Sequence, residues 1–159
     1  NYRIDGYGAA FRIEAYDVAH MSGKNMVGVM TVLENGIPAK NEYKKFIIKT
    51  QKNSNDTGAL EEILSRRFRH LEWGVPDLIV LDGALAQENI ARQVLSRFQL
   101  EIPVVAVVKD ERHKAKEIRG NKKDIEKRED SILLANSEAH RFAIAFHKQK
   151  RAKDFLGDK

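Results

Sequence analysis

The sequence contains no cysteine, and this absence excludes two kinds of site. The chain can form no disulfide and no thiolate metal centre, so any metal must be bound by carboxylate, imidazole or water. This composition fits the cytoplasm, where we expect the protein to work. The sequence also lacks the roughly 20 consecutive apolar residues of a membrane span, because its longest apolar run covers only residues 104–108. Its first residues have neither the basic tip nor the apolar stretch of a signal peptide, so we expect none.

Some motifs of known chemistry are absent as well. No glycine-rich loop of the kind that cradles phosphate is present, since Gly6-Tyr7-Gly8 is too short and precedes a predicted strand. No Ser-His-Asp arrangement stands out. A glycosidase with two catalytic carboxylates stays open, because that function depends on their distance in space, which the sequence does not give. No internal repeat is visible. With 159 residues, 42% hydrophobic and 32% charged, the sequence predicts one globular domain with its own core.

The chain is basic overall, with a formal net charge of +5. That excess alone is weak evidence for a nucleic-acid partner, because many proteins carry it for solubility. Its distribution is more informative, since basic residues gather near the ends of two predicted helices. The helix dipole also favours basic residues in a last helical turn. Phosphate contact and this dipole role are therefore equally good explanations of the clusters. The two groups are Arg66, Arg67 and Arg69, and Lys148, Lys150, Arg151 and Lys153.

Three strands are predicted in the first third of the chain. Residues 11–20 alternate and then run apolar, and residues 26–33 are rich in β-branched side chains. Asn35-Gly36 is a strong hairpin signal, and residues 45–50 supply the return strand. We therefore expect an antiparallel meander of three strands.

Alternating helices and strands follow the meander. An apolar stripe of helical period predicts a helix that has Asp56 or Thr57 as its N-cap and ends before Pro76. A strand over residues 77–82, a second helix and a strand over residues 104–108 come next. The order β-β-β-α-β-α-β predicts an α/β fold in which helices cover both faces of a mixed sheet. The first stripe consists of Leu60, Ile63, Leu64, Phe68 and Leu71, and the second of Ile90, Val94, Leu95 and Phe98.

Residues 109–130 are dense in charges of both signs, and we expect them to form a charged loop or hairpin excursion. Gly120-Asn121 permits a short exposed hairpin in this segment. The last helix is predicted from about Ser131 to about Phe155. Its buried stripe is expected to comprise Ala135, Ala139, Phe142 and Phe146. The domain is thus expected over residues 11–155, between an N-terminal extension at 1–10 and a tail at 156–159.

Two apolar runs end on an aspartate, and these aspartates are the first candidates for chemistry. The runs are Arg12-Ile-Glu-Ala-Tyr-Asp17 and Asp77-Leu-Ile-Val-Leu-Asp82. Ligands of open α/β sheets bind at the rim where such strands end. If the two strands are neighbours, their carboxylates repel each other unless they share a cation, and Mg²⁺ or Mn²⁺ suits such oxygen ligands. Taken singly, each aspartate is more often a cap or turn residue, as in Asp82-Gly83.

Five further residues rank below these aspartates. His20 is interpreted first as a loop histidine bonded to backbone. His140 and His147 share one side of the last helix, where packing is the commoner role; acting as ligand or general base requires that helix to cross the carboxylate end of the sheet. Asp56 is explained by capping before it is considered as a third carboxylate. Glu14 is expected on the opposite face of its strand from the aspartate, because their separation is odd.

Four short motifs occur in an order and spacing that resemble a known family. They are Asp17-Val-Ala-His20, Glu42-Tyr-Lys-Lys-Phe46, Asp77-Leu-Ile-Val-Leu-Asp-Gly83 and Glu138-Ala-His-Arg-Phe-Ala-Ile144. Together they resemble the C-terminal endonuclease domain of UvrC, the incision subunit of the bacterial UvrABC nucleotide excision repair system. The resemblance covers about residues 11–153, and the last motif, followed by Phe146-His147, is the most diagnostic.

The resemblance implies a ribonuclease H-like fold and an endonuclease that cuts DNA on the 5′ side of a lesion with Mg²⁺ or Mn²⁺. It implies an Asp-Asp-His catalytic group at Asp17, Asp82 and His140, in which the two aspartates bind the metal, and it raises Asp56 above a simple cap. The implied partners are damaged double-stranded DNA and UvrB, the latter contacted through regions outside this chain. We expect no membrane partner and a monomer. DNA contacts are expected from Arg66, Arg67, Arg69, Arg141, Lys148 and Arg151, and His20 is kept as a secondary candidate for the site.

The chain departs from the family pattern at two motifs. The family continues its second aspartate as Asp-Gly-Gly-Lys-Gly-Gln, whereas this sequence has Asp82-Gly-Ala-Leu-Ala-Gln87, which removes a glycine and a positive charge beside the expected metal site. The first motif has Val18-Ala19 where Ile-Ser is usual. The family's other domains have no counterpart here, so we expect a fragment or a reduced relative. Two alternatives stay open: a non-catalytic nucleic-acid-binding module on the same fold, and a ribonuclease acting on RNA or hybrids.

Overall fold

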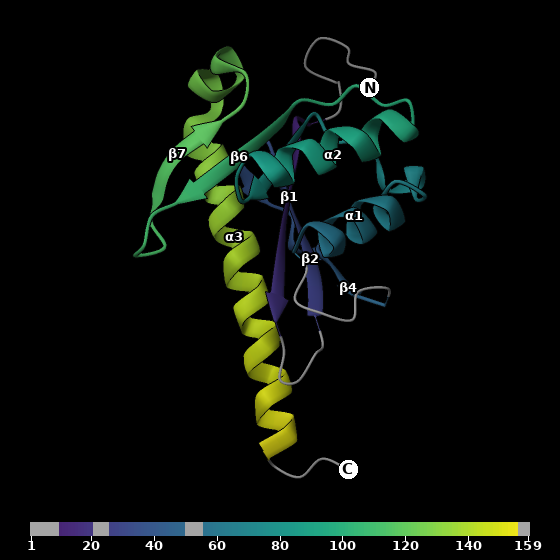
Figure 1. Cartoon of the computed structure of the whole chain (residues 1–159), viewed down its shortest axis with the longest axis vertical. Helices are drawn as coiled ribbons and strands as arrows, with labels where there is room; N and C mark the ends of the chain where they lie inside the picture. The colour runs from purple at the N-terminus through teal and green to yellow at the C-terminus, as the bar shows by residue number, and fades with distance from the viewer. Residues whose placement is uncertain (1–9, 21–25, 50–55, 156–159) are drawn as a thin grey trace.

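The structure, a computed structural model, describes residues 10–20, 26–49 and 56–155, and for residues 146–155 it describes the backbone alone. One mixed sheet forms the centre of the molecule (Figure 1). Its first part is the predicted meander: β1 (Arg12–His20) pairs antiparallel with β2 (Met26–Glu34). The other edge of β2 pairs with β3 (Ile37–Pro38) and then with β4 (Lys44–Ile47), so the return strand is present but interrupted.

The second part of the sheet is parallel. β5 (Leu78–Asp82) lies between β1 and β6 (Val104–Lys109) and runs parallel to both. β7 (Ala115–Arg119) closes this side by pairing antiparallel with β6. The seven-stranded sheet has the order β3-β2-β1-β5-β6-β7, with β4 beside β2. The predicted mixed sheet is confirmed, and β1 and β5, which carry the two candidate aspartates, are neighbours.

Helices cover both faces of the sheet, as predicted (Figure 1). α1 (Asp56–Arg67) and α2 (Leu85–Arg97) pack together over one face, and the long α3 (Lys122–Phe155) runs along β1 and β2 on the other. Two short 3₁₀ helices, η1 (Lys40–Glu42) and η2 (Leu71–Trp73), follow β3 and α1. No described helix is long and apolar enough to cross a membrane.

The two faces of the sheet have separate apolar layers because alternate strand residues point in opposite directions. Along β1, Tyr16 packs with the helices α1 and α2, whereas Ile13 and Ala15 pack against α3. On β5, Leu81 belongs to the first layer and Val80 to the second. By the same alternation, Asp17 and Asp82 fall on the side of the sheet that α3 covers.

Gly28 sets the approach of α1 to the sheet. A Cβ built on this residue of β2 would lie only 2.1 Å from Cδ1 of Ile63, which is fully buried on α1. Real atoms never approach so closely, so any larger residue here must push the helix or the isoleucine aside. The absence of a side chain therefore allows the close packing of helix on strand.

Two boundaries in the first half of the chain differ from expectation. Asp17 does not end its strand, because β1 continues in register with β2 to His20. α1 ends at Arg67, so Leu71 is not part of its buried stripe; it lies in η2 with 55% of its surface exposed. The helical period was extrapolated one turn too far, past the point where the chain bends toward Trp73.

The charged segment 109–130 is more ordered than predicted. The hairpin turn lies at residues 110–114, where the carboxylate of Asp110 accepts the backbone N–H groups of Arg112 and Lys114. The predicted hairpin at Gly120-Asn121 is wrong, because these residues join β7 to α3. The side chain of Asn121 accepts the N–H groups of residues 123 and 124, which caps a helix that starts nine residues before Ser131 and bends at Arg128.

Candidate functional site

Asp17 and Asp82 lie side by side at the edge of the sheet. The register of β1 and β5 pairs Tyr16 with Leu81, so the next residue of each strand is an aspartate on the same face. Both line one cavity of about 100 Å³, together with Asp56 at the start of α1 and Gln87 in the first turn of α2. The two carboxylates that the sequence separates by 65 residues thus meet, as their places on the strands predict.

The cavity disfavours negative charge at Asp17. Burial raises the pKa of this carboxyl group from 3.8 to about 6, and the charge of Asp82 adds to the rise. Val18 donates its N–H to the carboxylate at 2.8 Å, and this bond and the contact with His140 act in the opposite direction without cancelling the rise. A cation between the two carboxylates would offset their mutual repulsion.

Asp82 has two partners that sequence reasoning missed. Nζ of Lys109 donates to its Oδ1 at 2.6 Å, and Nδ2 of Asn136 donates to the same oxygen at 3.2 Å. A signal for each was available. Lys109 follows the apolar run 104–108 as Asp82 follows its own, and Asn136 precedes His140 by four residues on α3, which places both on one face of the helix.

His140 reaches the site because α3 crosses β1 where Asp17 lies. Its Nδ1 is 3.3 Å from Oδ2 of Asp17, and 49% of its side chain is exposed. The geometric condition for a ligand or a proton-transfer role, a helix that crosses the carboxylate end of the sheet, is therefore met. The side chain of His147 lies outside the described residues.

Asp56 and His20 form a second pair at the rim. Nε2 of His20 lies 2.9 Å from Oδ1 of Asp56, with both side chains largely exposed. Asp56 is the first residue of α1, one position inside the expected cap. His20 is the last residue of β1 and contacts this carboxylate, so the interpretation as a loop histidine bonded to backbone is wrong. The pair adds a third carboxylate to the lining of the cavity.

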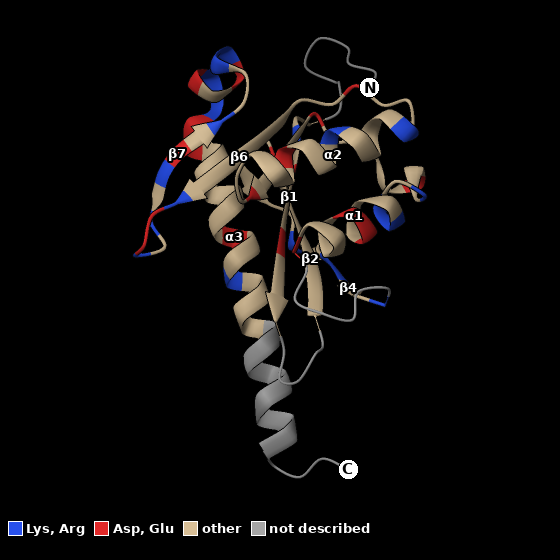
Figure 2. Ribbon diagram, in the orientation of Figure 1, with Lys and Arg blue, Asp and Glu red and all other residues tan. Residues whose placement is uncertain are grey.

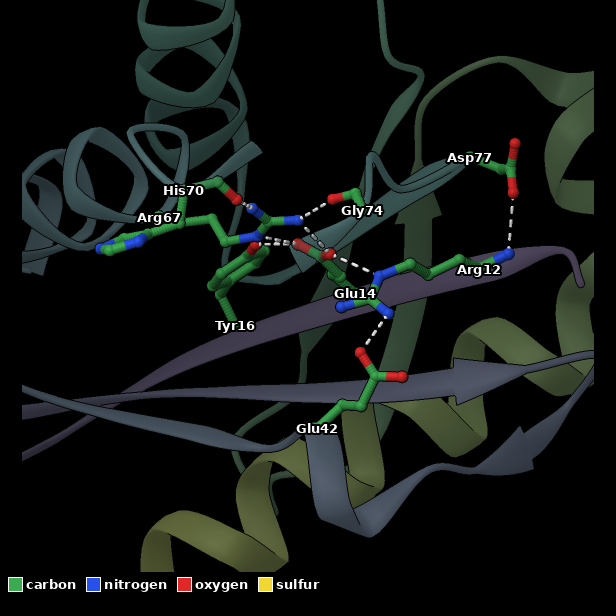
Figure 3. Close-up of polar contacts among 8 residues, drawn as sticks. All are labelled: Arg12, Glu14, Tyr16, Glu42, Arg67, His70, Gly74 and Asp77. Carbon is green, nitrogen blue, oxygen red and sulfur yellow. Dashed lines mark hydrogen bonds and ion pairs between the residues drawn. The ribbon is translucent and has the colours of Figure 1, made fainter. Parts of the chain in front are cut away.

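In contrast to our prediction, Arg67 is fully buried and so is not available at the surface for a DNA contact. Figure 3 shows its side chain directed toward Glu14. Its guanidinium binds both carboxylate oxygens of Glu14, at 2.8 and 2.6 Å. It also donates to the carbonyl oxygens of His70 and Gly74. The remaining contacts of Glu14 come from the hydroxyl of Tyr16 and from Arg12, which in turn pairs with Glu42.

The other predicted DNA-contacting residues lie at the surface or outside the description. Arg69 is exposed beyond the end of α1, and Arg66 donates to the carbonyl oxygen of Ile47 and to Glu62. Ten residues of helix place Arg66 roughly 15 Å from Asp56 along the axis, so this group is not part of the carboxylate site. Arg141 is half exposed and pairs with Glu138. Figure 2 shows Lys and Arg mixed with acidic residues on β7 and the start of α3. Lys148 and Arg151 fall among the side chains that are not described.

The donor atoms of the cavity suit a hard divalent cation. Asp17 and Asp82 offer carboxylate oxygens, and Asp56 and His140 are the further groups within the site. In the described part of the chain no three acidic or histidine groups converge tightly enough to form a ready-made metal cage, and Asp82 is engaged by Lys109. The residues present fit Mg²⁺ or Mn²⁺ by ligand type and charge, with room for water in the coordination sphere.

Comparison with known proteins gives a consistent family. Residues 7–144 match the family described as the UvrC RNase H endonuclease domain. The UvrABC system protein C of Clostridium acetobutylicum is 39% identical over 91% of this chain, and that of Finegoldia magna is 35% identical over 96%. In both cases the match covers 27% of the relative. The chain thus spans about a quarter of the length of these proteins.

Solved structures with a similar fold include nucleic-acid enzymes. Endonuclease V of Ciona intestinalis, in complex with inosine-containing DNA, aligns with a TM-score of 0.48 and 15% identity, over 69% of this chain and 51% of that one. Aquifex aeolicus Argonaute aligns with a TM-score of 0.46 and 14% identity, over 71% and 17%. At such scores these likenesses carry no functional conclusion. The sequence match, together with the mixed sheet and its helices, shows that the chain belongs to the family of UvrC RNase H endonuclease domains.

Proposed function

We propose that this chain is a divalent-metal-dependent DNA endonuclease domain that makes the 5′ incision in nucleotide excision repair. One observation carries the proposal: Asp17 and Asp82 line the same small cavity, with His140 3.3 Å from Asp17. Such an arrangement provides a cation-binding edge next to a group that can transfer a proton. Both can assist the hydrolysis of a phosphodiester.

Each residue has a distinct role in this proposal. Asp17 and Asp82 would hold Mg²⁺ or Mn²⁺, which when bound lowers the pKa of an attacking water and offsets charge on the phosphate. His140, which is half exposed, either completes the coordination sphere or accepts a proton from the water. Asp56 and His20 lie at the mouth of the cavity, where they can orient water or substrate. Gln87 accepts the N–H of Ala84 and so supports the loop after Asp82.

The proposed substrate and partner are inferred by analogy with the relatives. Proteins named UvrABC system protein C supply the expectation of damaged double-stranded DNA and of UvrB, contacted through regions beyond this domain. The net charge of +5 agrees with a polyanionic substrate. Damage recognition is not expected within this domain, and we expect the domain to act as a monomer.

The test is cleavage of nicked, bubble and RNA–DNA hybrid substrates in Mg²⁺ and in Mn²⁺. Asp17→Asn, Asp82→Asn and His140→Ala should abolish cutting while the circular dichroism spectrum stays that of the wild type. Asp130→Asn, which changes an exposed aspartate of α3, is the matched control and should cut normally. A variant at Asp17, Asp82 or His140 that retains near wild-type activity removes that residue from the mechanism.

A second candidate is a non-catalytic nucleic-acid-binding module. The ion pair between Lys109 and Asp82, together with Ala84-Leu85 where the family has glycine and lysine, favours it. Binding without cleavage in either metal would establish this module and reject the nuclease. Cleavage confined to RNA or hybrid strands would instead indicate a ribonuclease.

A further inference from the structure

Three charged residues of neighbouring strands lie close together at one edge of the sheet. Val105 and Val107 of β6 pack on the α3 side of the sheet, and Val107 pairs with Asp82. Lys109 lies two residues beyond Val107, after an irregularity in the pairing with β7, and its ammonium group reaches Asp82. On the same face, Asp82 comes two residues after Val80 of β5, and Asp17 comes two residues after Ala15 of β1. Two carboxylates and one ammonium group therefore gather at this edge of β1, β5 and β6.

The ammonium group is held closely at Asp82. Its nitrogen lies 2.6 Å from Oδ1, and the two side chains are only 19% and 27% exposed. Asn136, which is buried on α3, donates to the same oxygen at 3.2 Å. Because both donors use one carboxylate oxygen, a metal ion that binds this oxygen must compete with them. The lysine is the stronger competitor, since it is a cation in a partly desolvated pair.

We propose that Lys109 is a built-in cation that occupies Asp82 before the divalent ion binds, and that the ion must displace its ammonium group. This inference rests on the proposed metal site. The four-carbon stem of lysine allows the ammonium to swing away while the backbone of β6 stays in the sheet. Lys109 thus lowers the affinity of the site for the ion and neutralises one carboxylate while the ion is absent.

Removing the charge of Lys109 should lower the stability of the ion-free protein and raise its affinity for Mn²⁺. Lys109→Met keeps an unbranched apolar stem that is one atom shorter and removes the charge. The metal-free protein should lose stability, because Asp82 then lacks its cationic partner next to Asp17. The dissociation constant for Mn²⁺ should fall by about fivefold to tenfold, because the competing cation is gone. A residue that only supports the fold or orients Asp82 would not tighten ion binding.

The experiment is titration calorimetry of Mn²⁺ into the purified domain without DNA, so that the readout is independent of cleavage. Lys116→Met is the matched control, since it removes the same charge from the exposed face of β7 in the same hairpin. Lys116→Met should change the dissociation constant for Mn²⁺ by less than about twofold relative to the wild type, which is well below the change expected for Lys109→Met. Lys109→Arg retains a cation and should bind Mn²⁺ like the wild type. If Lys109→Met does not fold, Lys109→Gln removes the charge with a polar side chain.

A second readout follows the ammonium group directly. Its nitrogen-15 resonance in the wild type should shift on addition of Mg²⁺, as the group leaves Asp82. Equal or weaker Mn²⁺ binding by Lys109→Met and Lys109→Gln would overturn the inference and leave the metal site intact. If the wild type and Asp17→Asn both fail to bind Mn²⁺, the metal site itself is wrong and the proposed function fails with it.

Discussion

Glu14 and Asp17 show how two acidic residues of one strand acquire different properties. They lie three positions apart on β1 and therefore face opposite sides of the sheet. Glu14 is fully buried, but two arginines and a tyrosine hydroxyl satisfy its charge. Among the described residues, the polar partners of Asp17 are a backbone N–H and a half-exposed histidine, and a second carboxylate lies beside it. The charge of Glu14 is compensated within the protein, whereas that of Asp17 favours an external cation.

Asp17→Asn should therefore stabilise the ion-free protein in a pH-dependent way. Because the folded state raises the pKa of this carboxyl group from 3.8 to about 6, the folded protein binds the proton more tightly than the unfolded chain. Stability is lost as the pH rises through this interval, by at most about 3 kcal/mol once the group is ionised. Urea denaturation should show the gain from Asp17→Asn at about pH 8, shrinking toward about pH 4. A gain that is the same at every pH would contradict this origin, and Asp130→Asn should show no gain.

Arg67 and Arg69 should differ sharply in their effect on stability. Arg67→Met leaves Glu14 buried without its bidentate partner and removes the donors to the carbonyl oxygens of His70 and Gly74. We therefore expect the free energy of unfolding to fall by about 3–5 kcal/mol. Arg69→Met, at an exposed position, should stay within about 0.5 kcal/mol. Chemical denaturation measures both. Similar losses in the two variants would refute the structural role of Arg67.

Helical spacing distinguishes Arg67 from Arg69 in the sequence. The distinction was overlooked because the position in the apolar stripe is occupied by a charged residue. Position 67 continues the apolar stripe of Leu60, Ile63 and Leu64 at helical spacing, whereas position 69 does not. The partner Glu14 is 53 residues away, so the buried ion pair depends on a tertiary contact that spacing cannot reveal. Asp17 and Asp82 were easier to place, since each follows an apolar run on one of two neighbouring strands, whereas His140 was assigned from the family motif.

At the scale of elements, long periodic segments were predicted well and charged ones were not. β1, β2, β5 and β6 and the helices α1 and α2 follow from alternation and apolar stripes. β7 was missed because it is an edge strand on which only Ile118 packs against the core. α3 starts earlier than predicted because the side chain of Asn121 caps it. The many charged residues around Asn121 led us to predict a loop or hairpin instead.

Gly28→Ala should destabilise the contact between α1 and β2. The new Cβ would fall 2.1 Å from Cδ1 and 2.4 Å from Cγ1 of Ile63, in a fully buried layer. We expect a loss of about 1–3 kcal/mol in the free energy of unfolding. A double-mutant cycle with Ile63→Val, which deletes the nearest methyl group, should show that the two losses are less than additive. If the losses of the two variants simply add, the strain of Gly28→Ala does not come from its contact with Ile63.

At the scale of the whole molecule, DNA binding should weaken steeply with salt. A chain with a net charge of +5 that contacts phosphates releases counterions, and each contact contributes about −0.9 to the logarithmic slope for duplex DNA. Fluorescence anisotropy over a series of salt concentrations measures this slope. Arg69→Gln should reduce it by about one contact. A flat salt response in the wild type would argue against any backbone contact.

The two candidate metal ligands differ in how firmly the backbone holds them. Asp17 lies inside β1, where it is paired with Val29 of β2 and followed by three more strand residues. Asp82 is the last residue of β5 and precedes Gly83, whose φ of +150° and close approach to Gln87 exclude a larger side chain. The departures from the family motif begin directly after this glycine. The domain therefore combines one carboxylate inside a strand with one at a strand end, and a change in the loop after β5 should shift Asp82 more than Asp17.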